Sequence, residues 1–220
     1  MIEQITIQNL LPNVFLGMEN TEKIRFSQVW EKPSFVFRRG CRICLQAESG
    51  SGKSSLLSFI CGLRSDYKGA ILFNNTDTRS LTTARWCEMR SRNIALLPQE
   101  MALFPELSVA QNIDIKNNRT RHKTTAEIKD LLLRVELSDK HDSPAGRLSI
   151  GQQQRVALIR SVCQPFDFIF LDEPVSHLDT RNNKIIADII SEEAARQGAG
   201  VVATSVGNHL LLDNAQFISL

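Results

Sequence analysis

The sequence has no apolar run long enough to cross a membrane. A bilayer span needs about 20 mostly apolar residues, whereas the strongest runs, such as 168–171, have the length of a strand. The first residues include Glu3 where a secretory signal carries basic residues, and no sustained apolar stretch follows. We therefore expect a protein that stays in the cytoplasm.

An excess of charge of either sign is also absent. The chain has 26 Lys and Arg against 24 Asp and Glu, a formal net charge of +2, so we expect no nucleic-acid partner. Hydrophobic residues make up 42% and charged residues 23%, which excludes a disordered or fibrous chain. A length of 220 residues suits one domain, or one core with an inserted lobe.

Cysteines are few and do not suggest a disulfide framework. There are five, an odd and scattered set, so we expect reduced thiols. Cys41 and Cys44 form a C-x-x-C sequence, but in an expected strand residues three apart face opposite sides. No second pair completes a zinc site, and we expect two buried core thiols.

The hydrophobic pattern predicts an α/β fold. Alternating apolar residues favour strands at 3–10, 22–30 and 34–37, so the N-terminal part is expected to be mostly β. A strand at 41–47 leads through a glycine- and serine-rich loop into a helix at 53–63.

The rest of the chain divides into a helical stretch and a return to alternating strands and helices. A short pair of strands is expected around 69–75, and further strands are expected at 93–97, 166–171 and 200–206, with a helix at 183–196. Between them the pattern is helical, with Ser108 as a candidate N-cap. We predict one domain over residues 1–220, with a core of about 1–99 and 165–220 and a helical lobe of about 100–164.

Residues 47–54 read Ala-Glu-Ser-Gly-Ser-Gly-Lys-Ser and match the phosphate-loop pattern G-x-x-x-x-G-K-[ST] at every position but Ala47. Glycines let the backbone turn tightly and aim N–H groups at phosphate oxygens, and the following helix adds its positive end. The residues of this expected cradle are Ser49, Gly50, Ser51 and Gly52. An alanine at 47 is tolerable if its φ is negative.

The helix start adds side chains to this cradle. Lys53 would supply a positive charge to the outer phosphates, Ser54 a hydroxyl ligand to Mg²⁺, and Ser55 a further phosphate donor. The alternative is a glycine- and serine-rich turn that caps a helix, but such a turn does not need the Lys-Ser pair. The sequence therefore predicts a site for a nucleotide and Mg²⁺.

An apolar strand at 168–171 ends in two carboxylates, Asp172 and Glu173. The carboxyl edge of a parallel sheet is where α/β proteins bind ligands. Asp172 would hold Mg²⁺, and Glu173 would orient or deprotonate an attacking water. A solvated acidic turn before Pro174 is the alternative, and the phosphate loop argues against it.

Residues 148–155 read Leu-Ser-Ile-Gly-Gln-Gln-Gln-Arg and resemble the signature L-S-G-G-Q-Q-Q-R of ATP-binding cassette (ABC) ATPases. Gln99 in LLPQ resembles the Q-loop of that family, and SHLD at 176–179 resembles its D-loop. The resemblance implies the P-loop NTPase fold, with a RecA-like core, an N-terminal antiparallel β region and an α-helical lobe. It also implies a head-to-tail homodimer with two ATP molecules between the subunits.

In such a dimer the signature of one chain completes the nucleotide site of the other. The resemblance assigns Ser149, Gly151 and Gln152 to this contact, and it assigns Gln99 to Mg²⁺ and the attacking water. Ile150 replaces the first signature glycine, a position where the family admits other residues.

The largest departure from the family is at Ser205. The family follows the threonine of this strand with a switch histidine that contacts the γ-phosphate, whereas Thr204 is followed here by Ser205. His209 could compensate only if its loop were rearranged, and His177 in the D-loop is expected to be a contact across the dimer. Hydrolysis is therefore expected to be slow, with Ser205 at the catalytic position.

The resemblance also implies an aromatic residue that stacks on adenine. Phe15 in LPNVF is the first candidate, with Trp30 and Phe26 as alternatives. A core position is the competing interpretation for each of the three.

The leading hypothesis is the ATPase subunit of an ABC transporter, which powers a separate membrane permease from the cytoplasmic face. The chain looks most like the small cassettes of lipoprotein release, macrolide export and cell division. The alternative is a regulatory or scaffolding cassette that binds ATP and dimerises but hydrolyses slowly. ABC ATPases of DNA repair or translation need long insertions or tandem cassettes, for which 220 residues leave no room.

Overall fold

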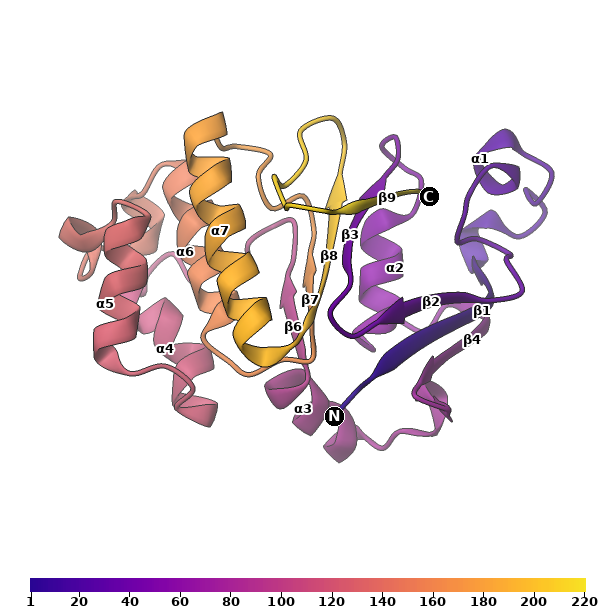
Figure 1. Ribbon diagram of the computed structural model, residues 1–220, viewed down its shortest axis with the longest axis horizontal. Coiled ribbons are helices and arrows are strands. Elements are labelled where there is room, and N and C mark those ends of the chain that lie inside the picture. The colour runs from indigo at the N-terminus through magenta and orange to yellow at the C-terminus, as the bar shows by residue number, and fades with distance from the viewer.

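The computed structural model describes residues 1–220, apart from the side chain of Lys23. Two sheets form the body of the molecule: a four-stranded sheet in the order β2-β1-β4-β5 and a five-stranded sheet in the order β6-β7-β8-β3-β9. Helix α2 (Lys53–Ile60) lies between them, and the helices within residues 109–162 and 180–197 lie on the other side of the five-stranded sheet (Figure 1).

The five-stranded sheet is parallel throughout. Its strands are β6 (Ile94–Leu97), β7 (Phe168–Leu171), β8 (Gly200–Ser205), β3 (Arg42–Gln46) and β9 (Gln216–Ser219). Every residue of β7 is buried, which explains its continuous apolar run. Because all five strands run the same way, the loops after β3, β6, β7 and β8 leave from one edge.

The four-stranded sheet is antiparallel. It contains β1 (Gln4–Pro12), β2 (Phe35–Arg38), β4 (Tyr67–Phe73) and β5 (Thr76–Asp77). In β1, apolar and polar residues alternate, and the apolar Ile5 and Ile7 are both fully buried. The pairing of β1 with β4 shifts after Gln8, and only a glycine fits opposite this irregularity, because a Cβ on Gly69 would lie 2.3 Å from the carbonyl oxygen of Asn9.

The strand expected at 22–30 is wrong. The segment forms the short helix α1 (Glu22–Arg25) followed by a turn. A strand would place Ile24, Phe26 and Trp30 on one face, yet Phe26 is 72% exposed while the other two are buried. The Ser27 hydroxyl accepts from the N–H groups of Val29 and Trp30, and this local turn takes the donors that a strand would offer a neighbour.

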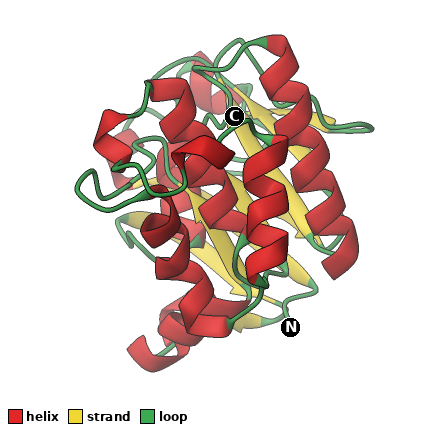
Figure 2. Ribbon diagram, turned by 90° about the vertical axis from the view of Figure 1, so that its left-hand side faces the viewer, coloured by secondary structure: helices red, strands yellow, loops and turns green.

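Three helices fill the stretch expected to be helical: α4 (Val109–Thr120), α5 (Thr125–Arg134) and α6 (Ile150–Val162). Each begins with a capping box, in which a Ser or Thr hydroxyl and a Gln or Glu side chain bond each other's backbone N–H groups. Helix α7 (Thr180–Gln197) packs beside them on the parallel sheet (Figure 2). Lys123 and Glu193 form a buried ion pair of 2.6 Å that fastens the lobe to α7.

Several elements were not expected from the sequence. Helix α3 (Thr83–Arg92) has little apolar surface, with only Met89 buried, and β9 is a short edge strand. Four short 3₁₀ helices cover Asn13–Phe15, Thr78–Ser80, Ser138–Lys140 and Ala145–Arg147.

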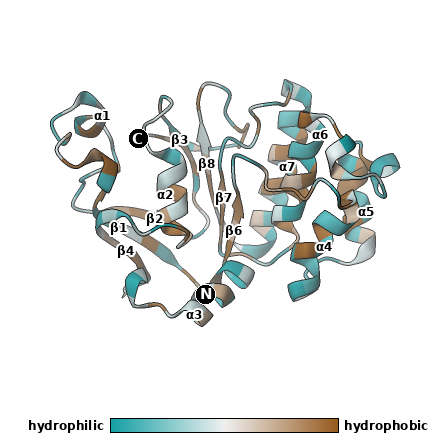
Figure 3. Ribbon diagram, turned by 180° about the vertical axis from the view of Figure 1, so that it is seen from behind, coloured by the Kyte–Doolittle hydropathy of each residue, from teal (hydrophilic) through white to brown (hydrophobic). Residues whose placement is uncertain are grey.

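The parallel sheet has a separate core on each face. Phe168, Phe170 and Val202 face α2 and the antiparallel sheet, while Ile169 and Val201 face α4, α6 and α7. This is the two-residue period of a sheet covered on both sides. Apolar colouring accordingly runs along β6 and β7 (Figure 3).

Among the described residues, none of the helices is both long and apolar enough to span a membrane.

All five cysteines are free thiols. Cys44 is buried as expected, but Cys41 is only half-buried.

Candidate functional site

The loops that follow three parallel strands meet at one pocket. The loop after β3 carries the phosphate-loop sequence, Gln99 follows β6, and Glu173 follows β7. The pocket has a volume of about 340 Å³ and is lined by Val14, Phe15, Ser49, Gly50, Gly52, Lys53, Ser54, Ser55, Gln99 and Glu173. A larger hollow of about 620 Å³ lies beside α5, but no residue of the phosphate loop lines it.

The phosphate loop has the backbone that its glycines predict. Gly50 and Gly52 have φ values of +76° and +94°, in the left-handed region where glycine carries no penalty. A Cβ on Gly52 would lie 2.9 Å from the Trp30 ring and 3.2 Å from the Phe15 ring. Ala47 has no positive φ, so its methyl group is accommodated.

Trp30 packs against the phosphate loop. Its indole N–H donates to the carbonyl oxygen of Ser51 at 3.0 Å, and the side chain is 1% exposed. Trp30 therefore has no face free to stack on a base. A buried indole N–H needs a hydrogen-bond acceptor, so the sequence indicates that Trp30 has one. It does not indicate that the acceptor is Ser51.

Lys53 is buried at the start of α2. Its Nζ donates to the carbonyl oxygens of Ala47 at 3.0 Å and Glu48 at 2.9 Å, both in its own loop. Burial lowers the pKa of Lys53, and attraction from Glu173 and Asp172 opposes that effect. The Ser51 hydroxyl is also buried and has no hydrogen-bond partner among the described atoms.

Thr204 holds the acidic pair at the end of β7. Its hydroxyl donates to Asp172 Oδ1 at 2.6 Å and accepts from the backbone N–H of Glu173 at 3.0 Å. Asp172 is 5% exposed. Glu173 has a φ of +48°, and it lines the pocket. Sequence reasoning missed Thr204, because its two partners directly follow the neighbouring strand β7 and are far from it in the sequence.

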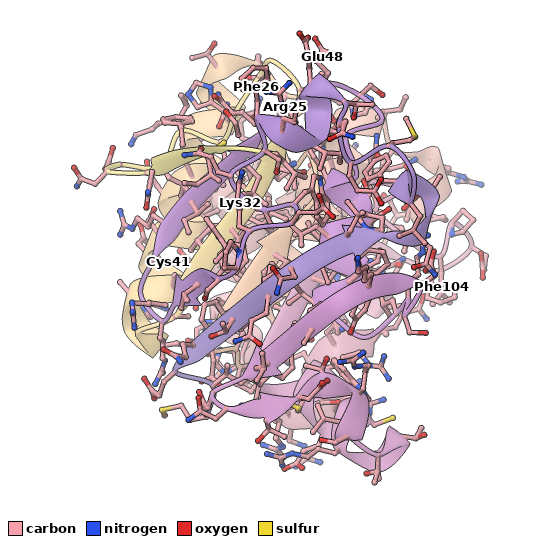
Figure 4. The ribbon with its side chains drawn as sticks, turned by 90° about the vertical axis from the view of Figure 1, so that its right-hand side faces the viewer. Arg25, Phe26, Lys32, Cys41, Glu48 and Phe104 are labelled. Carbon is pink, nitrogen blue, oxygen red and sulfur yellow. The ribbon has the colours of Figure 1, made fainter. Side chains whose placement is uncertain are left out.

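The three aromatic candidates for base stacking lie in different places. Phe15 lines the pocket and meets Trp30 edge-on at 6.4 Å between ring centroids. Phe26 lies at the outer surface, directly after α1 (Figure 4), and does not line the pocket. Of the three, only Phe15 has a position suited to a base.

The signature residues do not line this pocket in their own chain. Ser149 caps α6, where its hydroxyl accepts from Gln152 N at 3.3 Å and Gln152 Oε1 accepts from Ser149 N at 2.9 Å. Gly151 lies against the D-loop, because a Cβ there would be 3.0 Å from the carbonyl oxygen of His177.

Gln154 on α6 joins the signature helix to the acidic end of β7. Its amide N–H₂ donates to the carbonyl oxygen of Glu173 at 3.1 Å, and its oxygen accepts from the N–H of His177 at 3.1 Å. The signature, the D-loop and the acidic pair therefore form one hydrogen-bonded unit.

Ser205 and the two nearby histidines all lie outside the pocket lining. Ser205 is 1% exposed, and its hydroxyl is 3.6 Å from Cys44 Sγ. The His209 ring packs edge-on against Phe217 at 5.1 Å. His177 is exposed, with Nδ1 3.0 Å from the Ser176 hydroxyl.

Comparisons with known proteins show the family of the chain. The family model described as "ABC transporter" matches residues 30–176. The lipoprotein-releasing system ATP-binding protein LolD of Shewanella denitrificans is 29% identical over 182 residues, which cover 81% of this chain and 78% of LolD. The Fe(3+) ions import ATP-binding protein FbpC of Fusobacterium nucleatum is 34% identical over 174 residues, 77% of this chain. That alignment covers 45% of FbpC, so the chain spans less than half of the length of that relative.

Among solved structures, the dimeric bacterial ABC transporter cassette MJ0796 superposes with a TM-score of 0.76 over 98% of this chain and 94% of its own. The sequences are 21% identical, so this likeness shows the fold.

Proposed function

Because the chain belongs to the ABC transporter family, we propose that it binds and hydrolyses ATP to power a separate membrane permease. The observation that carries this proposal is the shared pocket, in which the phosphate loop, Gln99 and Glu173 face one another. This edge of the parallel sheet collects the groups that phosphoryl transfer requires: a cradle, a cation and a carboxylate.

The donor set suits a nucleotide with Mg²⁺. Lys53 bonds only uncharged carbonyl groups of its own loop, so it can turn to a phosphate without breaking an ion pair. Ser54, Gln99 and Asp172 offer the hard oxygen ligands that Mg²⁺ prefers. When bound, Mg²⁺ neutralises charge on the phosphates. Phe15 offers its ring to the base.

Glu173 is the proposed general base. A water attacks the γ-phosphorus, the bond to the oxygen between the β- and γ-phosphorus breaks, and Glu173 takes a proton from the water. The Thr204 bond to Glu173 N fixes the backbone from which this carboxylate projects. Gln99 orients the water.

A second copy of the chain is proposed to complete the site. Ser149, Gly151 and Gln152 lie away from the pocket of their own chain, and the N-terminus of α6 suits an anion. A head-to-tail dimer brings this signature onto the phosphates of the partner.

The segment after Gln99 is the proposed permease contact. The side chain of Phe104 is 47% exposed (Figure 4). Its backbone is held by Asn112 of α4, whose amide oxygen accepts from the N–H of Phe104 and whose amide nitrogen donates to the carbonyl oxygen of Phe104. Arg160 of α6 donates to the carbonyl oxygen of Ala102 at 2.7 Å. The segment thus connects the pocket to the signature helix. Binding to the permease would place the chain at the cytoplasmic face of a membrane.

The relatives named above act on different cargoes, lipoproteins for LolD and Fe(3+) ions for FbpC. We therefore propose that this chain hydrolyses ATP and that the permease determines which cargo is transported.

A slow regulatory cassette is the second candidate. It is favoured by Ser205, whose hydroxyl faces Cys44 instead of the pocket. A single-turnover measurement in the presence of the permease separates the two functions, since a regulatory cassette stays slow with its partner bound.

Equilibrium binding and light scattering test the leading proposal. The Glu173→Gln variant should bind Mg-ATP and form a dimer, because the amide keeps the shape of the carboxylate but cannot take the proton. Glu100→Gln is the matched control, since Glu100 is exposed near the pocket without lining it. A Glu173→Gln variant that stays monomeric at saturating Mg-ATP contradicts the dimeric site.

A further inference from the structure

Arg64 contacts a residue of the phosphate pocket without lining the pocket itself. Its Nη1 donates to the hydroxyl oxygen of Ser55 at 3.0 Å. Ser55 lines the pocket, whereas Arg64 lines a neighbouring hollow of about 290 Å³. Arg64 is therefore a cation that contacts the phosphate site from outside the pocket.

Three contacts fix the guanidinium, although the side chain is 46% exposed. One arm bonds Ser55, and Nε donates to Asp66 Oδ1 at 2.9 Å. Its Cζ lies over the Phe59 ring at 5.3 Å from the centroid, within the range of a cation–π contact. Phe59 follows Ser55 by one helical turn, so one side of α2 presents both contacts to Arg64.

The bond to Arg64 determines what the Ser55 hydroxyl can do. A guanidinium has only donors, so Ser55 Oγ must be the acceptor. The hydroxyl hydrogen then has no part in this bond and is free to turn toward the pocket. A hydroxyl that accepts from a cation is also polarised into a better donor.

Arg64 lies away from the proposed catalytic residues. The hollow that it lines includes neither Gln99 nor Glu173, and its contact with the nucleotide pocket is made through Ser55. Arg64 should therefore affect nucleotide affinity and not the chemical step.

We propose that Arg64 is a positioning residue for the nucleotide, which orients the Ser55 hydroxyl to donate to a phosphate group that ATP and ADP share. This rests on the proposed ATP site. It gives the pocket a second cation besides Lys53, one that acts through a serine.

Titration calorimetry with Mg-ATP and Mg-ADP tests the proposal. Arg64→Gln should weaken both nucleotides by about three- to tenfold, since an exposed cation is screened by water. The KM for ATP should rise by a similar factor with little change in kcat, which is the pattern expected when binding that the ground state and the transition state share is lost. Arg79→Gln is the matched control, because Arg79 lines the same hollow and pairs with Asp77 as Arg64 pairs with Asp66, but does not touch Ser55.

A double-variant cycle separates positioning from a merely structural role. Once Ser55→Ala has removed the hydroxyl, adding Arg64→Gln should weaken binding by less than about twofold. Equal losses in the presence and absence of the hydroxyl would overturn the proposal, as would an Arg64→Gln variant that binds like the parent. If the parent itself binds neither nucleotide, the proposed function fails first and the role of Arg64 with it.

Discussion

Replacing Thr204 by valine should uncouple the acidic pair from β8 with almost no change in packing. Valine has nearly the shape of threonine and suits a strand, so only the hydroxyl is lost. Two bonds disappear with it: the one donated to Asp172 at 2.6 Å and the one accepted from Glu173 N at 3.0 Å.

The magnitude follows from the burial of Asp172, which is 5% exposed. A hydrogen bond to a charged group contributes about 1.5 to 3 kcal/mol, and the bond to the N–H about 1 kcal/mol. We therefore expect the free energy of unfolding to fall by roughly 2.5 to 4 kcal/mol at neutral pH, and ATP hydrolysis to fall because Glu173 loses its support.

Urea unfolding followed by tryptophan fluorescence measures the first effect, and phosphate release the second. Thr204→Ser is the control, since it keeps the hydroxyl and should retain most of both quantities. A Thr204→Val protein that unfolds within about 0.5 kcal/mol of the parent and hydrolyses ATP at the parental rate would refute this account of the site.

Three further outcomes are expected. Lys53→Ala should weaken Mg-ATP binding by about 1.5 to 3 kcal/mol in an equilibrium titration, the value of one charge-assisted contact; an unchanged affinity would rule out the phosphate cradle. Ser205→Ala should alter phosphate release by less than about twofold, because the Ser205 hydroxyl faces Cys44. Ser205→His should raise the rate by about tenfold or more, equivalent to ~1.4 kcal/mol off the barrier, if the imidazole reaches the γ-phosphate; a histidine variant no faster than the parent would show that Ser205 is not a catalytic defect.

Local patterns predicted much of the fold. The strand, glycine-rich loop and helix around Lys53 follow from adjacent residues, and the continuous apolar run of β7 required cover on both faces. The candidate N-cap Ser108 marked the start of α4 in the same way.

The failures depend on interactions that the sequence does not show. Residues 22–30 alternate like a strand, but the Ser27 hydroxyl turns the backbone locally. The roles of Thr204, Gln154 and Arg64 depend on partners from other elements or loops, and no spacing rule identifies such contacts. Ser205 could be recognised as a departure, yet its orientation toward Cys44 is a property of the folded sheet.

Single-turnover phosphate release with Mg-ATP, compared between the parent and Glu173→Gln, tests the central claim most directly. The account predicts that both proteins bind ATP and that the variant releases phosphate at least about a hundredfold more slowly, the usual contribution of a positioned base. Equal rates in the two proteins, with ATP bound to both, would contradict the claim that this pocket hydrolyses ATP through Glu173.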